Sequence, residues 1–268
     1  VYGLGADARN PAAVARVFAA KQRPRFDPLI VHIHSMAQLN AVAAAVSPAA
    51  HRLVEAFWPG PLTIVVPRSE TIPDIVTAGL PSVGIRMPHN RHALELIETA
   101  QTPLAAPSAN KFGRISPTCA AHVREQFDDE IDMIIDRGQC AVGVESTIIG
   151  CTTEQPVLLR PGGLALEDIT SVVGAVHIPP SDALTTASPG RQLRHYAPAT
   201  PLVVGDCAQV SRGMRTGLLS FQPVTAQADS GVNMYVRGTI AADRKYVTLN
   251  LSVQQRDEPT FERFEVQR

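Results

Sequence analysis

Short apolar runs alternate with helical patterns along the first 180 residues, and this alternation constrains the fold more than any other feature of the chain. Three expected helices begin with a capping side chain followed by proline, at Asn10-Pro11, Ser47-Pro48 and Ser116-Pro117. Apolar strands are expected at residues 29–33, 62–66, 83–87, 104–106, 131–135 and 147–150. The pattern predicts an α/β domain on a twisted sheet, and the closely spaced strands between residues 131 and 160 predict a mixed sheet.

The composition is that of a globular protein, with 45% apolar and 18% charged residues among 268. A formal net charge of −1 argues against a chain wrapped by nucleic acid, because such domains carry a marked basic excess. The four cysteines form no Cys-x-x-Cys pair, which predicts reduced thiols in a cytoplasmic protein. No apolar run reaches the roughly 18 to 20 residues of a membrane helix, so no membrane association is expected.

The composition changes between residues 179 and 200, where proline, serine, threonine and alanine replace the apolar periodicity. We interpret residues 1–178 as the main domain and residues 179–200 as an interdomain linker. Residues 201–268 are predicted to form a smaller C-terminal α/β, Rossmann-like domain, with strands at 201–204, 216–221, 232–236 and 246–251. The abrupt apolar start and the short tail favour a chain whose two domains are both incomplete.

The segment PLAAPSANKFGRISPT, residues 103–118, joins a short buried strand to a loop rich in hydroxyl and amide groups. Ser108, Asn110, Ser116 and Thr118 follow the strand directly, and Gly113 adds backbone freedom between them. Small polar groups displayed at a strand end are typical of a ligand site.

Three further places in the sequence carry charged or polar side chains that could bind a ligand. The cations of Lys21-Gln22-Arg23-Pro24-Arg25 have two interpretations of about equal weight. They form either a solvated helix end or a clamp for a polyphosphate. His32 interrupts an apolar strand, and taken alone it is about three times more often a satisfied core histidine than a pocket residue. Arg86 continues a half-buried strand and therefore needs a partner, which a carboxylate or phosphate would supply.

Two more strand ends show the same character, since Ser146 precedes one apolar run and Arg160 ends another. Each of these residues could simply mark the end of a strand. The repetition of hydroxyl groups and arginines at several strand ends predicts one concave site for an anionic ligand. The chain contains no P-loop, no G-x-G-x-x-G after its opening strand, no H-E-x-x-H and no G-x-S-x-G motif. The residues alone therefore predict only an α/β protein with a phosphate- or carboxylate-binding cleft.

The ordered segments KQRPRFDPLIVHI, FWPGPLTIVVPR, VGIRMP, PLAAPSANKFGRISPT, GVESTII and LLRPGG resemble the YrdC/Sua family of threonylcarbamoyl-AMP synthases. The resemblance covers nearly all of residues 1–180, and Ser188-Pro-Gly with Arg194-His-Tyr-Ala-Pro198 resembles the linker of two-domain members. It implies a nucleotidyltransferase that converts L-threonine, bicarbonate and ATP to L-threonylcarbamoyl-AMP and pyrophosphate. It also implies Mg²⁺ accompanying ATP, a downstream threonylcarbamoyl transferase complex, and at most weak contact with the tRNA modified at position 37.

The same resemblance implies roles for individual residues. It places Arg23, Asp27, Ser82, Ser108, Ser116, Arg160 and Tyr196 against ATP, and His32, Arg86, Ala106 and Ser146 against L-threonine. Lys21, Arg23 and Asn110 are the expected catalytic residues, and no residue is assigned to a metal. Tyr196 lies in the linker and is expected to close over the nucleotide, and Ser116 is expected to present a helix N-terminus to phosphate.

Two departures and two alternatives accompany the resemblance. Family members carry a threonine-bearing segment before the position of Val1, and Asp27 stands where asparagine is common, so its charge needs magnesium or Lys21 as a counterion. One alternative is a carbamoyl-transfer domain of the same fold that uses carbamoyl phosphate. The other is a double-stranded RNA-binding module, which the near-neutral charge disfavours.

Overall fold

The computed structural model describes residues 1–179, 232–240, 246–255 and 258–267. The chain divides into two compact units, Val1–Ala199 and Thr200–Arg268, which are described separately. Among the described residues, no helix combines the length and the apolar character needed to cross a membrane.

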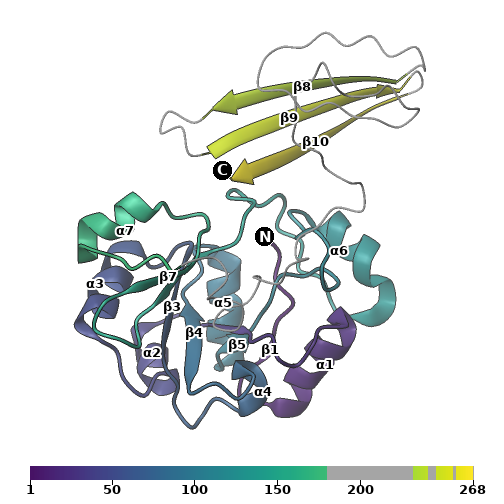
Figure 1. Ribbon diagram of the computed structural model, residues 1–268. Helices are drawn as coiled ribbons and strands as arrows, with labels where there is room; N and C mark the ends of the chain where they lie inside the picture. Colours follow the sequence, from purple (N-terminus) through teal and green to yellow (C-terminus); the bar gives the residue numbers. More distant parts are fainter. Residues whose placement is uncertain (180–231, 241–245, 256–257, 268) are drawn as a thin grey trace. The chain divides into compact units, whose positions relative to one another are not determined.

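The first unit is built on a seven-stranded sheet (Figure 1). In spatial order its strands are β1 (Ala6–Asp7), β5 (Leu104–Ala105), β2 (Ile30–His32), β4 (Ser82–Arg86), β3 (Leu62–Pro67), β6 (Thr147–Gly150) and β7 (Val157–Arg160). The pairs β2–β4 and β3–β6 are parallel, whereas β1–β5, β2–β5, β3–β4 and β6–β7 are antiparallel. The predicted mixed sheet is thus confirmed.

Seven α-helices flank this sheet in the described part of the first unit, together with a 3₁₀ turn at Asp128–Glu130. They are α1 (Pro11–Lys21), α2 (Met36–Val42), α3 (Pro48–Phe57), α4 (Asp74–Thr77), α5 (Arg91–Ala100), α6 (Ala120–Phe127) and α7 (Leu166–Val173). The Asn10 side chain accepts hydrogen bonds from the N–H groups of Ala12 and Ala13, and that of Ser47 accepts one from Ala50. Two of the three predicted helix starts are therefore confirmed.

The third predicted helix start, Ser116-Pro117, is wrong. Helix α6 begins at Ala120, and its N-cap position is Cys119. The backbone is held away from a helix at Pro117, whose carbonyl accepts a hydrogen bond from the Tyr2 N–H. Ser116 consequently caps no helix, and no helix N-terminus lies at its side chain.

The strand predicted at residues 131–135 is also wrong, because this segment joins no sheet. Ile131 and Ile134 pack instead on the cluster of Ala109, Val123 and Phe127 beside α6. The two partly buried isoleucines are three positions apart, so the period-two alternation of a strand is absent. The apolar run therefore reflects packing against a helix.

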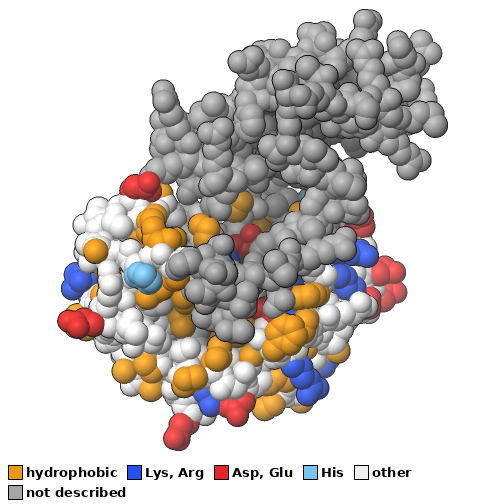
Figure 2. All heavy atoms as spheres, in the orientation of Figure 1, with side chains coloured by type: hydrophobic (Ala, Val, Ile, Leu, Met, Phe, Trp, Pro, Cys, Tyr) orange, Lys and Arg blue, Asp and Glu red, His pale blue; other side chains and the backbone are white. Residues whose placement is uncertain are grey.

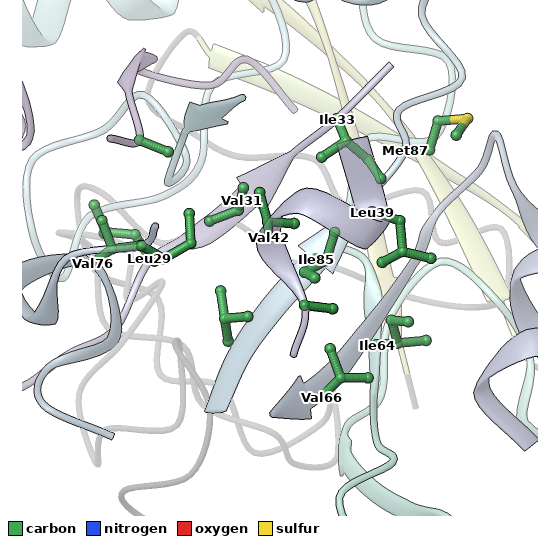
Figure 3. Packing of buried hydrophobic residues seen from close by; sticks show 14 of the residues in the cluster. Leu29, Val31, Ile33, Leu39, Val42, Ile64, Val66, Val76, Ile85 and Met87 are labelled. Atoms are coloured by element: carbon green, nitrogen blue, oxygen red, sulfur yellow. The ribbon is translucent and has the colours of Figure 1, made fainter. Parts of the chain in front are cut away.

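One face of the sheet carries the main core of the unit. Alternate strand residues such as Val31, Ile64 and Ile85 point to this face and are fully buried. They join a single cluster with apolar residues of α1, α2, α3, α4 and α7, and Figure 3 shows part of this packing. Burial of this face provides the main hydrophobic stabilisation of the unit.

The opposite face of the same strands is different, and we call it the polar face. Its buried apolar cluster, Ile30, Val65, Ile148 and Leu159, contains strand residues only. The period-two alternation of the strands brings these further side chains to the polar face: His32, Thr63, Ser82 and Arg86. Polar and charged groups therefore gather on one side of a sheet whose other side is apolar.

The described part of the second unit consists of β8 (Val232–Ile240), β9 (Tyr246–Gln255) and β10 (Glu258–Gln267). They form an antiparallel sheet in the order β10-β9-β8. Two of these strands coincide with those predicted at 232–236 and 246–251 and extend further. The strands predicted at 201–204 and 216–221 lie outside the described residues, as does the linker from residue 180 onward, and a Rossmann-like fold stays a prediction.

Candidate functional site

The loop after β5 is fixed by the N-terminal segment of the chain. The N–H of Leu4 donates to the carbonyl of Pro107, and that of Ala109 donates to the carbonyl of Tyr2, both across about 2.8 to 2.9 Å. A Cβ atom on Gly3 would lie 3.5 Å from the Cβ of Ala106, so the two segments are in close contact. The polar groups predicted to bind ligand thus stand on a firmly held backbone.

Lys21, at the end of α1, is tied to this loop. Its Nζ donates to the carbonyl oxygens of Ser108 and Asn110, and only 1% of the residue is exposed. Burial lowers the pKa of Lys21 to about 7, and the positive charge of Arg23 acts in the same direction. The structure therefore places Lys21 beneath the loop, where its first contacts are backbone carbonyls.

Asn110 combines satisfied donors with an unsatisfied acceptor. Its Nδ2 donates to the carbonyls of Lys111 at 2.9 Å and Arg114 at 2.8 Å, which fixes the orientation of the amide. Its Oδ1 is buried and has no hydrogen-bond partner among the described residues. A buried acceptor without a partner is costly, so a ligand donor at this oxygen would be favourable.

The basic turn after α1 contains a buried ion pair. A terminal guanidinium nitrogen of Arg23 lies 2.9 Å from a carboxylate oxygen of Asp27, and both side chains are 3% exposed. The same guanidinium donates to the carbonyls of Asp27 and Pro28. Burial raises the pKa of Asp27 and the charge of Arg23 opposes this rise, so Arg23 is the counterion that Asp27 needs.

His32 and Arg86 end two adjacent parallel strands and stand opposite each other in the β2–β4 register. His32 Nδ1 lies 3.2 Å from the Ile30 carbonyl oxygen. Burial, with the charge of Arg86 in second place, lowers the pKa of His32 to about 3, so the ring is neutral. If Nδ1 carries the proton and donates to Ile30, Nε2 is an acceptor.

Arg86 offers unused donors at the edge of an open cavity. Its Nε donates to the Gly60 carbonyl at 3.0 Å, while its two terminal amino groups donate to none of the described residues. Burial lowers the pKa of Arg86 to about 10, with a smaller contribution from Arg160. The adjacent cavity has a volume of about 340 Å³, and its lining includes Trp58, Pro59, Gly60 and His89.

Ser146 and Arg160 meet at the start of β6. Arg160 donates from Nε and from a terminal nitrogen to the Ser146 carbonyl, at 3.2 and 2.9 Å, and approaches Ser146 Oγ at 3.3 Å. A Cβ atom on Gly162 would lie 2.3 Å from the Ser146–Thr147 peptide, so only glycine permits this close approach. Arg160, expected at ATP, thus contacts a residue expected at threonine.

Thr63 is a polar residue of this site that the sequence analysis missed. It lies on β3, has no exposed surface, and its Oγ1 lies 2.7 Å from Ser146 Oγ. The signal was present in the strand LTIVVP, where a hydroxyl takes the same face as Val65. Strand alternation combined with the positions of His32 and Arg86 would have placed it on the polar face.

The remaining predicted positions are distributed as follows. Ser82 begins β4 and lines a small hollow of about 20 Å³ on the polar face, together with Pro28 and Thr63. Ala106 pairs with the start of β2 through its N–H, which donates to the Ile30 carbonyl at 3.0 Å. Ser116 donates to a carboxylate oxygen of Glu145 at 2.5 Å, and Tyr196 lies outside the described residues.

The structure thus assembles two groups of site residues, one at each end of β2. Lys21, Arg23, Asp27, Ser108 and Asn110 surround the end where β2 begins, and His32 and Arg86 stand where β2 and β4 end. The charge of Arg160 affects the pKa of both Asp27 and Arg86, so its field reaches both groups. Such an arrangement can hold a molecule with two separate anionic ends.

Comparison with known proteins identifies the family. The sequence model of the Sua5–YciO–YrdC family, described as "Telomere recombination", matches residues 1–162. The chain belongs to this family. The resemblance on which the residue assignments were based is therefore confirmed.

Individual Sua5–YciO–YrdC relatives are similar over most of the chain. A threonylcarbamoyl-AMP synthase of Pyrococcus abyssi is 50% identical over 208 residues, covering 76% of this chain and 61% of the relative. One of Bacillus subtilis is 45% identical over 208 residues, covering 76% of this chain and 60% of the relative. The chain spans about three fifths of the length of these curated relatives.

A solved Sua5 structure agrees with the fold. The crystal structure of P. abyssi Sua5 complexed with L-threonine has a TM-score of 0.72 and 51% sequence identity to this chain. The similarity covers 74% of this chain and 60% of the solved one. The mixed sheet with flanking helices is thus the fold of the family.

Proposed function

We propose that the protein is an ATP-dependent threonylcarbamoyl-AMP synthase, which forms L-threonylcarbamoyladenylate and pyrophosphate from L-threonine, bicarbonate and ATP. The observation that carries the proposal is the pair of unused terminal amino groups on Arg86, beside neutral His32, in a chain 50% identical to a synthase of this name. A fixed fork of guanidinium donors suits a carboxylate, and L-threonine supplies one.

The chemistry asks the protein to align substrates rather than to form a covalent intermediate. The amine of threonine captures bicarbonate as a carbamate with loss of water, and a carbamate oxygen then attacks the α-phosphate while pyrophosphate leaves. Arg86, His32, Ala106 and Ser146 would hold threonine. The ATP would lie toward Ser82, Ser108 and the Arg23–Asp27 turn, where positive charge offsets the phosphates.

Three residues have more specific proposed roles at the phosphates. Lys21, with its pKa near 7, would become fully protonated when the negatively charged phosphates bind nearby. Arg23 would interact with both Asp27 and a phosphate group. The unpartnered Oδ1 of Asn110 would accept a hydrogen bond from the substrates, for example from the carbamate N–H. Arg160 would join the two substrate sites, because it already contacts Ser146. Ser116 and Tyr196 remain predicted ATP contacts.

We propose that Mg²⁺ arrives on the phosphates of ATP. The carboxylate of Asp27, one of the expected ATP contacts, is already paired with Arg23, which disfavours its use as a metal ligand. When bound, the ion would neutralise phosphate charge and favour departure of pyrophosphate. The product would pass to a threonylcarbamoyl transferase complex acting on tRNA, and a cytoplasmic location would suit that role.

Pyrophosphate release tests the proposal directly. The purified protein, given ATP, Mg²⁺, bicarbonate and L-threonine, should release pyrophosphate, and omission of threonine or bicarbonate should abolish the release. Release that ignores threonine would refute the assignment. Release that requires carbamoyl phosphate in place of threonine would favour a carbamoyl-transfer domain instead.

An RNA-binding role has a separate test. Figure 2 shows basic and acidic side chains interspersed on the visible described surface, and the whole chain has a formal charge of −1. Binding of double-stranded RNA should therefore be weak and should fall further with salt. Salt-sensitive RNA binding that survives Arg86→Ala and saturating ATP would favour an RNA-binding module over a small-molecule site.

A further inference from the structure

The hydroxyl groups of Thr63 and Ser146 form a buried pair between β3 and the residue that precedes β6. In the β3–β4 register Ile64 stands opposite Ile85, which places Thr63 level with Arg86. On its other side, Thr63 Oγ1 lies 2.7 Å from Ser146 Oγ. Thr63 therefore stands between the arginine and the serine that are expected to hold threonine.

The direction of the hydrogen bond between the two hydroxyls follows from their other partners. A hydroxyl has one proton to donate and two lone pairs to accept with. Arg160 approaches Ser146 Oγ at 3.3 Å and is a donor only, so one lone pair of Ser146 is engaged. Thr63 Oγ1 has no other hydrogen-bond partner among the described residues.

If Ser146 donated to Thr63, the Thr63 proton would be left without an acceptor at a position with no exposed surface. A buried donor without a partner costs about 1–3 kcal/mol. If Thr63 donates instead, both lone pairs of Ser146 are engaged, by Thr63 and by Arg160. The proton of Ser146, which is 3% exposed, is then available to an acceptor in the site.

The methyl group of Thr63 fixes the side chain in this orientation. A Cβ atom built on Gly84 would lie 3.4 Å from Thr63 Cγ2, so the methyl group packs over Gly84 on the β4 side. A β-branched side chain has few allowed χ1 rotamers, and a methyl held toward β4 turns the hydroxyl toward β6. Both substituents of Thr63 therefore have a defined role.

We propose that Thr63 is a positioning residue that makes Ser146 a hydrogen-bond donor toward an anionic oxygen of the amino-acid substrate. The inference rests on the proposed function. It adds that Ser146 is the donor in its contact with the substrate, and that Thr63 determines this direction. The recognised group is a carboxylate or carbamate oxygen, because only an acceptor complements the hydroxyl proton of Ser146 beside the Arg160 cation.

Matched substitutions separate the hydroxyl of Thr63 from its methyl group. Thr63→Val keeps the shape and removes the donor, so KM for L-threonine should rise about 3- to 10-fold, as for the loss of one hydrogen bond. KM for ATP should change less than about twofold in the same pyrophosphate assay. Thr63→Ser restores the hydroxyl and should recover most of the affinity for threonine.

A double-mutant cycle tests whether Thr63 acts through Ser146. In a Ser146→Ala background, Thr63→Val should cause no further rise in KM for L-threonine, because the hydroxyl it orients is gone. Thr77→Val is the matched control, since Thr77 is equally buried but donates only to the Asp74 carbonyl in α4, and its kinetics should be unchanged. Thr63→Ala removes the same hydroxyl and replaces Thr63→Val if the valine variant does not fold.

The outcomes distinguish this inference from the proposed function. Equal losses for both substrates, additive effects in the double variant, or an unchanged Thr63→Val enzyme would overturn the role of Thr63 while the wild type still requires threonine. If the wild type shows no threonine-dependent release of pyrophosphate, the proposed function fails. Calorimetry of L-threonine binding to the wild type and to the Thr63→Val variant, without ATP, then tests the role of Thr63 independently of turnover.

Discussion

The two faces of one sheet differ more than any other pair of regions in the described protein. On one face, Val31, Ile64 and Ile85 are buried under helices in a single apolar core. On the other, the neighbouring residues in the same strands include His32, Thr63 and Arg86. Adjacent residues of one strand thus have different roles, because one packs in the apolar core and the next faces the candidate site.

This difference explains how charged groups are tolerated within a buried sheet. The buried charged side chains of the site have specific partners, as Arg23 has in Asp27 and Arg160 has in the Ser146 carbonyl. The opposite face, which the helices cover and which we call the covered face, needs no such pairing. Its stabilisation depends on apolar area and close packing. Substitutions on the two faces should therefore change different measured quantities.

The largest expected effect is on the covered face. Ile64→Ala should lower the free energy of unfolding by about 3–5 kcal/mol, because it leaves a cavity in the main core. Ile30→Ala, on the small cluster of the polar face, should cost only about 1–2 kcal/mol. Denaturant unfolding measures both, and equal losses would contradict the separation of the two faces.

Arg86→Ala should give the next largest effect, in kinetics. Loss of the guanidinium should lower kcat/KM for L-threonine about 100- to 1000-fold, as expected when a charged hydrogen-bonded pair is lost. KM for ATP should change much less. Arg91→Ala is the control, because Arg91 forms an exposed pair with Glu95 and should alter neither constant.

The pH dependence of stability should report the burial of His32. Its pKa of about 3 in the folded protein lies below the ordinary value of 6.5, so between these values the unfolded chain binds a proton that the folded chain does not. The contribution of neutral His32 to the free energy of unfolding should therefore be complete above pH 6.5. On acidification this contribution should fall by up to about 1.4 kcal/mol per pH unit.

Substitution isolates this contribution from other acidic groups. His32→Gln cannot take up the proton, so its unfolding free energy should fall less between pH 7 and pH 4.5 than that of the wild type. Urea unfolding at the two pH values measures the difference. Identical pH slopes would show that His32 is not held neutral by burial.

Ser108→Ala should have the smallest effect. The Ser108 carbonyl holds Lys21, whereas its hydroxyl contacts none of the described residues, so stability should be unchanged. KM for ATP should rise about 3- to 10-fold if the hydroxyl binds the nucleotide. A selective rise in KM for threonine would instead move Ser108 to the other substrate.

Much of the first unit could be predicted from its sequence. The helix of residues 11–21 follows from Asn10 as its cap and from the spacing of Val14, Val17 and Phe18, and all three are buried. The strands around Ile30, Ile64 and Ile85 follow from apolar runs. The errors at 116–117 and 131–135 arose where a tertiary contact, to Tyr2 and Glu145 or to the cluster of Ala109, Val123 and Phe127, overrides a local signal.

The sequence by itself determined the family and the residue types of the site, because motif order and strand periodicity are local properties of the chain. Only the tertiary structure decided the partners: Lys21 beneath the Ser108–Asn110 loop, Arg160 on the Ser146 carbonyl, and Thr63 on Ser146. These contacts join residues from different strands and loops. Their geometry depends on strand register and on packing of the covered face, neither of which is encoded in any single segment.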